Sequence, residues 1–147
     1  MSTHIRRTDD FRWDGVPVSA YKPGGTHFAA ITRQLLFDGG EGLGCQLRYF
    51  EVAPGGYSSL ERHRHAHAIM AIRGRGRALV GERILDLATH DLVKVPPLTW
   101  HQFRADGDEP FGFLCIVDCG RDTPERPDAE ALAALRRDPA IADFIRV

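Results

Sequence analysis

The chain carries the stretch PGGYSSLERHRHAHAIMAIRG at residues 54–74, and this stretch decides the fold. Its last part, AIMAIR followed by Gly74, is an apolar run that stops at a turn residue, which is typical of a short β-strand. Side chains two residues apart in a strand share a face, so Glu61 and His63 are expected to point the same way. The Pro and Gly residues at 54–56 would break a helix. The histidine-rich centre of the stretch is therefore expected on strands and corners.

Strand-like segments separated by Gly-rich and Pro-rich turns continue on both sides of this stretch. No long run with helical periodicity interrupts them, so the pattern predicts an antiparallel β-sandwich or barrel, and we expect a turn at 54–56. We expect the strands at 29–37, 45–53, 58–63, 67–73, 77–80, 91–95, 100–104 and 111–118.

The 147 residues are enough for one domain with its own core. We expect a polar arm with one short strand at 1–26, the barrel at 27–121 and a helical tail at 122–147. In the tail, Asp128 is positioned to cap a first helix whose last turn carries Arg136 and Arg137, and Pro139 is positioned to start a second helix. The apolar residues of both helices are expected to cover the barrel or a partner subunit.

Charge and composition exclude several classes of partner. The net charge is −1, which gives no electrostatic basis for binding nucleic acid or an anionic membrane. No apolar run reaches the length of a membrane span, and the polar start does not look like a secretory signal. The cysteines, Cys45, Cys115 and Cys119, are odd in number. We therefore expect free thiols in a reducing cytoplasm.

A second histidine signal lies downstream, where His101 follows a proline turn in PPLTWHQF. Three imidazoles with one carboxylate suit a divalent metal and leave coordination positions open for chemistry. We expect Mn²⁺ first, with Fe²⁺, Ni²⁺ or Zn²⁺ as alternatives. The predicted ligands are Glu61, His63, His67 and His101, and His65 competes with Glu61 for the fourth position.

Two motifs resemble those of the cupin family, whose members are small double-stranded β-helix barrels. Most cupins carry a histidine where this chain has Glu61, and a glycine where it has Leu98. The resemblance implies an all-β, single-domain jelly-roll barrel with a metal site, and the short C-terminal helices are added to it. The first motif maps onto Gly55, Glu61, His63, His67 and Gly74, and the second onto Asp91, Pro96 and His101.

A closer resemblance covers most of the chain, through RYFEVAPGGYSSLERHRHAHAIMAIRGRGRALVG, VPPLTWHQFRA, FGFLCIVD and LRRDPAIADFIRV. These stretches are similar to cupin enzymes of a bacterial methylthioadenosine salvage route that feeds isoprenoid synthesis. The resemblance implies that a methylthio group is removed from a phosphorylated ketose. A thiol such as glutathione accepts the group.

That chemistry needs a thiolate and cations for a phosphate. Cys115 lies in the strand FGFLCIVD and is the candidate nucleophile, although a buried cysteine also serves as a small core residue. Cys119 and Cys45 are weaker candidates. Predicted substrate-binding residues on strands are Arg33, Arg48, Arg73 and Arg104 for the phosphate and Tyr49 for the sugar.

Other functions fit the same barrel. A different metal reaction, such as that of a dioxygenase or a sugar isomerase, is the first alternative, and a non-enzymatic small-molecule-binding cupin is the second. Barrels of this size leave sheet edges and apolar faces exposed, so we also expect a homodimer to which the N-terminal arm or the C-terminal helices contribute.

Overall fold

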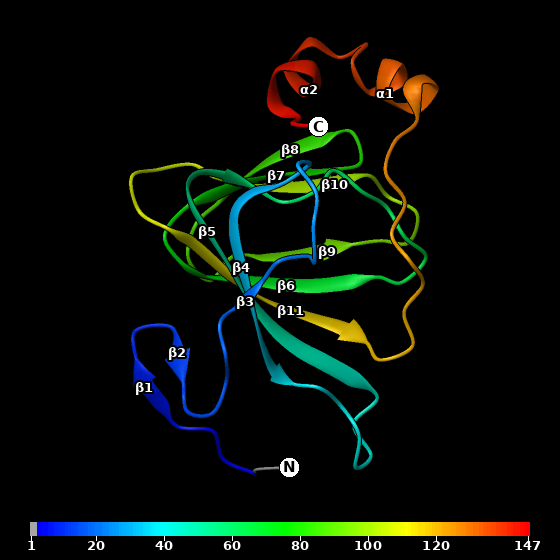
Figure 1. Ribbon diagram of the computed structural model, residues 1–147. Helices are drawn as coiled ribbons and strands as arrows, with labels where there is room; N and C mark the ends of the chain where they lie inside the picture. Colours follow the sequence, from blue (N-terminus) through cyan, green and yellow to red (C-terminus); the bar gives the residue numbers. More distant parts are fainter. Residues whose placement is uncertain (1–2) are drawn as a thin grey trace.

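The computed structural model describes residues 3–147. Within this part of the chain, the backbone forms eleven strands and two short helices (Figure 1). In chain order the strands are β1 Arg7–Asp9, β2 Arg12–Trp13, β3 Ser19–Ala20, β4 Ala29–Phe37, β5 Cys45–Tyr57, β6 His67–Arg73, β7 Gly76–Val80, β8 Arg83–Leu87, β9 Leu92–Val95, β10 His101–Ala105 and β11 Phe111–Asp118. The helices are α1 Ala129–Leu135 and α2 Pro139–Phe144.

Nine of the described strands join one antiparallel sheet that curls around a core (Figure 1). The order along the sheet is β8-β7-β10-β5-β11-β6-β9, with β4 also paired to β5 and β3 to β4. Alternate residues of these strands point inward, so that Phe50, Phe103 and Phe113 stack in the core while their neighbours face outward. The predicted all-β jelly-roll barrel with short C-terminal helices is confirmed.

Several predicted strands match closely, and one predicted turn is wrong. The segments 29–37, 67–73 and 111–118 coincide with β4, β6 and β11. Residues 54–56 do not form a turn, because β5 continues through them to Tyr57. Ile31 pairs with Val52 whereas Ala29 pairs with Tyr57, so the residues between Val52 and Tyr57 form a bulge. Gly55 has a φ of 80°, a conformation that glycine adopts without strain.

Other differences concern the edges of the barrel. The predicted strand at 58–63 is wrong, since this segment forms only isolated bridges at Glu61 and Arg62. Strand β8 was not predicted at all. The arm holds three short strands in its described part instead of one, and β3 pairs with β4 as part of the barrel sheet. The hairpin of β1 and β2 places the rings of Phe11 and Trp13 against Tyr49.

The C-terminal tail folds back as two capped helices over one end of the barrel (Figure 1). The side chain of Asp128 accepts a hydrogen bond from Ala131 N, and Asp138 caps α2, which Pro139 starts as predicted. Helix α1 ends at Leu135, so the predicted basic last turn is wrong. Neither helix is long enough to cross a bilayer, nor is any other helix of the described chain.

The tail forms a second hydrophobic core, separate from the one inside the barrel. Ile141, Phe144 and Ile145 are buried against Leu60 and Leu79 of the barrel, as expected for a covering element. The predicted role of the tail in covering the barrel is confirmed for these residues.

Removing one aromatic ring tests how much this second core contributes. Phe144 is 2% exposed, so Phe144→Ala should lower the free energy of unfolding by about 3 kcal/mol or more. The matched control is Leu43→Ala, because Leu43 is 45% exposed in the connection between β4 and β5 and should change stability little. Urea unfolding curves give both values. A loss for Phe144→Ala no larger than that of the control would mean that the tail packs only loosely.

Candidate metal centre

Three histidines from separate parts of the chain meet at one end of the barrel. His63 lies in the corner between β5 and β6, while His67 and His101 are the first residues of β6 and β10. Paired backbone hydrogen bonds between Glu61 and His101, of 3.0 and 3.2 Å, hold the two segments together. One ring nitrogen of each histidine lies within 4.8 Å of the others. The Nε2 atoms of His63 and His67 are 2.8 Å apart.

Backbone carbonyls fix the tautomers of two of these rings. His63 Nδ1 donates to the carbonyl of His65 at 2.7 Å, and His101 Nδ1 donates to the carbonyl of Thr99 at 2.9 Å. A carbonyl oxygen only accepts, so the proton is on Nδ1 and each Nε2 keeps its lone pair. Such carbonyl contacts orient metal-binding imidazoles in general.

The histidines are also held in their neutral form. Burial lowers the pKa of His63 to about 4, and burial followed by the charge of His101 lowers the pKa of His67 to about 2. Burial lowers the pKa of His101 as well. Only a neutral imidazole can donate a lone pair to a metal. The donors present therefore fit a borderline divalent ion.

Neither candidate for the fourth ligand belongs to this group of three. Among the described residues, the donor atoms that converge come from His63, His67 and His101 alone. The Glu61 carboxylate faces the same cavity but forms an ion pair of 2.5 Å with Lys22 Nζ. His65 stacks on His63 with ring centroids 3.7 Å apart, and its Nδ1 contacts the Asp122 carboxylate at 2.7 Å.

The segment 119–128 crosses the histidine corner on its way from β11 to α1, and we call it the strap (Figure 1). The Asp122 carboxylate accepts hydrogen bonds from the backbone N–H groups of Arg64 and His65, at 2.8 and 3.1 Å. Two backbone hydrogen bonds and an ion pair join Arg62 to Glu125. The strap thereby adds residues 121, 122 and 124 to the lining of the cavity.

Removing the Asp122 carboxylate should release the strap. Asp122→Ala leaves the Arg64 and His65 amides without their acceptor, so both should exchange with solvent deuterium about tenfold faster or more. Hydrogen exchange read by mass spectrometry on peptides covering 62–66 and 119–126 checks this. Asp118→Ala, at an exposed position at the end of β11, is the control and should leave both peptides unchanged. Unchanged exchange in Asp122→Ala would show that other contacts hold the strap.

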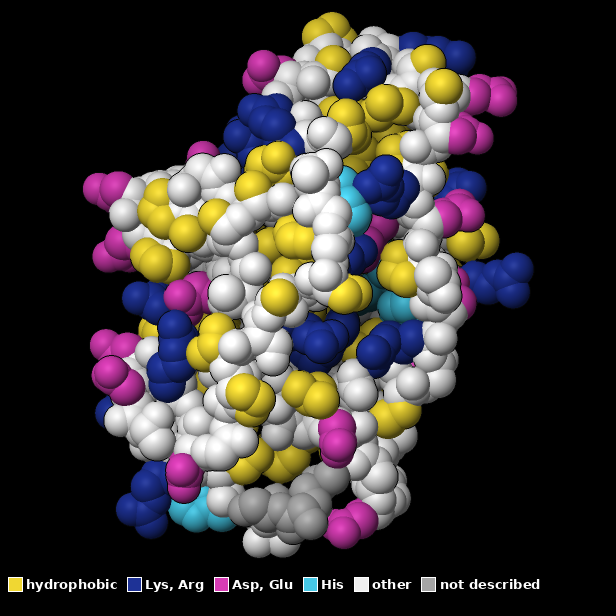
Figure 2. All heavy atoms as spheres, in the orientation of Figure 1, with side chains coloured by type: hydrophobic (Ala, Val, Ile, Leu, Met, Phe, Trp, Pro, Cys, Tyr) yellow, Lys and Arg dark blue, Asp and Glu magenta, His cyan; other side chains and the backbone are white. Residues whose placement is uncertain are grey.

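The cavity in front of the histidines has a volume of about 510 Å³. Phe50, Ile69 and Phe113 form part of its floor, while charged side chains line its walls. In the space-filling view, Lys or Arg and His side chains lie deep in the middle of this face (Figure 2). Its size and mixed lining suit a small polar substrate.

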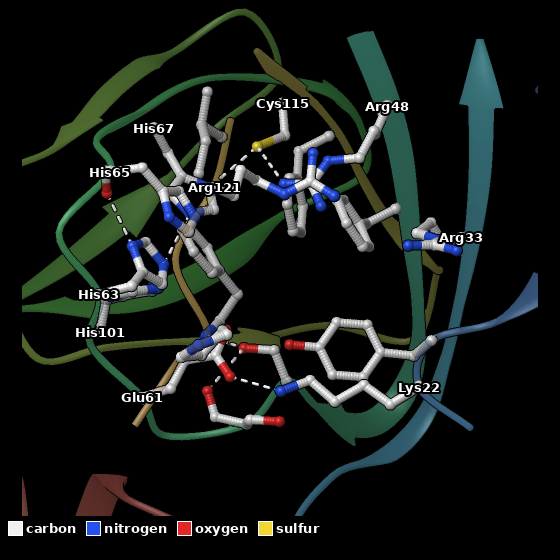
Figure 3. Close-up of a pocket in the computed structure, with 18 of the residues that line it drawn as sticks. Lys22, Arg33, Arg48, Glu61, His63, His65, His67, His101, Cys115 and Arg121 are labelled. Atoms are coloured by element: carbon white, nitrogen blue, oxygen red, sulfur yellow. Dashed lines mark hydrogen bonds and ion pairs between the residues drawn. The ribbon is translucent and has the colours of Figure 1, made fainter. Parts of the chain in front are cut away.

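One thiol faces this cavity. Cys115 on β11 is 1% exposed, and its Sγ lies 3.0 Å from His67 Nδ1 and 3.4 Å from Arg48 Nη2 (Figure 3). Burial raises the pKa of the thiol, and the Arg48 guanidinium acts in the opposite direction. Cys45 and Cys119 are outside the cavity lining, and their positions are partly exposed and exposed, respectively.

The predicted substrate-binding residues divide into two groups. Arg33 and Arg48 line the cavity. Tyr49 follows Arg48 in β5 and therefore faces outward, where it and Arg73 contact the Glu51 carboxylate, each at 2.9 Å. Arg104 is directed toward α2, where it donates to the Phe144 carbonyl at 2.7 Å.

Two cations of the cavity have no counterpart in the sequence prediction. Lys22 lies in the arm and Arg121 in the strap, and both line the cavity. They belong to irregular segments without strand periodicity, so no face could be assigned to them from sequence. For Arg121, the only local sequence signal is that it closely follows the end of a predicted strand, in Asp118-Cys119-Gly120-Arg121.

Known proteins share this architecture. The family model described as a cupin domain matches residues 48–117. A 1-methylthio-D-xylulose 5-phosphate methylsulfurylase from Rhodospirillum rubrum is 52% identical over 136 residues, which cover 92% of this chain and 86% of that protein.

Two solved structures extend the likeness to three dimensions. A cupin 2 conserved barrel domain protein from Rhodopseudomonas palustris is 53% identical with a TM-score of 0.93, covering 99% of this chain and all of that one. A cupin-2 domain from Rhodospirillum rubrum is 50% identical with a TM-score of 0.86, covering 96% of this chain and 94% of that one. The histidine geometry, the curled sheet and these likenesses agree, and the chain belongs to the cupin family.

Proposed function

We propose that this cupin removes the methylthio group from 1-methylthio-D-xylulose 5-phosphate and transfers it to a thiol, leaving 1-deoxy-D-xylulose 5-phosphate. The name of the 52% identical relative supports this substrate. The observation that carries the proposal is the position of Cys115, whose Sγ lies in the cavity beside His67. Glutathione is the proposed acceptor, and the cytoplasm is the proposed compartment.

The proposed reaction has two thiol steps. The Cys115 thiolate attacks the thioether sulfur, so that a Cys115–S–S–CH₃ bond forms and the bond from that sulfur to C1 breaks. The electron pair of the broken bond passes into the ketone as an enolate, which is then protonated at C1. A thiolate of the acceptor attacks the methylthio sulfur, releases Cys115 and leaves as a methyl disulfide. C1 of the substrate is reduced by two electrons, which come from the acceptor thiol and the methylthio sulfur as these two sulfurs form the methyl disulfide, and Cys115 is regenerated.

Two side chains next to Cys115 favour the attack of its thiolate on the thioether sulfur. Arg48 Nη2 contacts the sulfur at 3.4 Å and stabilises its anionic form. His67 would present Nε2 to a divalent metal, together with His63 and His101, which places its remaining proton on Nδ1 to donate to Cys115 Sγ. A divalent ion there, Mn²⁺ as the first choice, would supply a Lewis acid that favours departure of C1 as an enolate.

A homodimer is the proposed assembly. Leu92 is 74% exposed on β9 and Ile116 is 47% exposed on β11, two strands that flank β6 on either side. Exposed apolar side chains on neighbouring strands are suited to contact with a second copy.

A thiol-dependent assay under anaerobic conditions tests the proposed function. Purified protein loaded with Mn²⁺ is incubated with the methylthio sugar phosphate and glutathione, and the methyl disulfide and deoxy sugar phosphate are measured together. We expect the two products in equal amounts, with no requirement for O₂. Turnover that needs O₂ would support the dioxygenase alternative, and binding without turnover would support a binding protein.

A further inference from the structure

Three arginines enter the cavity from three different segments. Arg33 comes from β4, Arg48 from β5 and Arg121 from the strap (Figure 3). Arg48 and Arg121 lie close to Cys115 in this view, between the histidines and Arg33. We call these three residues the arginine cluster.

The arginine cluster lacks a counter-charge. Within residues 3–147, no carboxylate forms an ion pair with any of its three members, and Arg121 donates only to the uncharged Gln46 side chain and the Asp118 carbonyl. The fourth cation of the cavity differs, because Lys22 is neutralised by Glu61 at 2.5 Å. Three unpaired cations in one partly enclosed space repel one another unless an anion joins them.

Burial raises the free-energy cost of leaving the arginine cluster without a counter-charge. Arg48 is 8% exposed, and its Nε–H is buried without a hydrogen-bond partner. The Nη2 atom of the same side chain is directed to Cys115, so Nε is left for another acceptor. Burial, and then the nearby charges of Arg48 and Arg33, lower the pKa of Arg121. An anion with several oxygen atoms would relieve both the missing hydrogen bond and the repulsion.

We infer that the arginine cluster binds the phosphate monoester of the substrate. The inference rests on the proposed function and adds the orientation of the substrate to it. The ester lies against Arg33, Arg48 and Arg121, while the ketone end is directed to the histidines, with Cys115 between them (Figure 3). Guanidinium groups match phosphate oxygens with paired hydrogen bonds, which a lysine does not provide.

The strap makes this a built site. Arg121 precedes Asp122, whose carboxylate is fixed to the backbone of residues 64 and 65. The hydrogen bonds of Asp122 to residues 64 and 65 therefore hold Arg121 in the cavity and also hold the histidine corner in place. The strap thus links the phosphate site to the histidine corner.

Binding of the reaction product tests the inference without turnover. The dissociation constants of 1-deoxy-D-xylulose 5-phosphate, of unphosphorylated 1-deoxy-D-xylulose and of inorganic phosphate are measured by titration calorimetry on wild type, Arg121→Gln and Arg33→Gln. We expect each substitution to weaken the phosphate ester and inorganic phosphate by about 10- to 100-fold, because each removes a charged hydrogen bond. The unphosphorylated sugar should bind all three proteins alike.

The exposed residue Arg7, paired with Asp10 outside the cavity, provides the control Arg7→Gln, which should bind all ligands as wild type does. An equal weakening of sugar and sugar phosphate, or no weakening of either, would overturn the inference. The two proposals fail separately. Arginine-dependent phosphate binding without methylthio release would contradict the proposed function alone, whereas release that is insensitive to both substitutions would contradict the inference alone.

Discussion

Cys115→Ser should lower the rate of glutathione-dependent methylthio release by roughly three orders of magnitude or more. The serine hydroxyl fits the same position but is a far weaker nucleophile and cannot form a disulfide. The loss should be in kcat, because the cavity and its arginines are unchanged. Stopped assays that quantify the deoxy sugar phosphate give the rates.

Cys119→Ser is the matched control for this loss. Cys119 is exposed directly after the end of β11, the strand that carries Cys115, and it is outside the cavity lining. The rate of the Cys119→Ser variant should therefore stay close to that of wild type. The fold of both variants is checked by their unfolding midpoints. A Cys115→Ser protein with the full rate would mean that the acceptor thiol attacks the substrate directly.

His101→Ala should remove the bound metal and the activity together. His101 supplies one of the three converging imidazoles, and its Nε2 is the nitrogen left free by the Thr99 carbonyl. Loss of a group that only orients a ligand already costs about 10- to 100-fold in metal affinity, so loss of the ligand itself should cost at least that. Metal content by mass spectrometry and Mn²⁺ titration measure the effect, and wild type should hold one ion per chain.

His90→Asn is the control, because His90 is exposed in a turn with a φ of 77°, which asparagine tolerates. It should bind Mn²⁺ with the affinity of wild type. Treating wild type with a chelator should abolish activity, and adding Mn²⁺ back should restore it. Metal binding of His101→Ala equal to that of wild type would contradict the assignment of the three histidines.

The regular parts of the fold could be predicted because alternation and turns are local properties. Strands β4, β6 and β11 were bounded correctly by their apolar runs and flanking Gly and Pro residues. The bulge at Gly55 has the sequence of a turn, since Pro and Gly residues occur in both, and the pairing with the partner strand decides between them. Strand β8 is not predicted because it is short and the apolar and polar residues of RILDL do not alternate.

The three histidines of the cavity can be predicted from the sequence, whereas the contacts made by the connecting segments cannot. His63, His67 and His101 stand out by spacing, and the structure brings their ring nitrogens together. The partners of Glu61 and His65, by contrast, are an arm lysine and a strap aspartate, 39 and 57 residues away along the chain. Such contacts depend on how irregular segments cross the barrel, which periodicity does not report.

The central claim is that Cys115 itself accepts the methylthio group. Intact-protein mass spectrometry after mixing wild type with substrate, in the absence of any acceptor thiol, tests it most directly. We predict that each chain gains one methylthio group in place of a hydrogen, that the group maps to the peptide containing Cys115, and that glutathione removes it. Formation of the deoxy sugar phosphate only after glutathione is added, from a protein whose mass never changes, would contradict the claim.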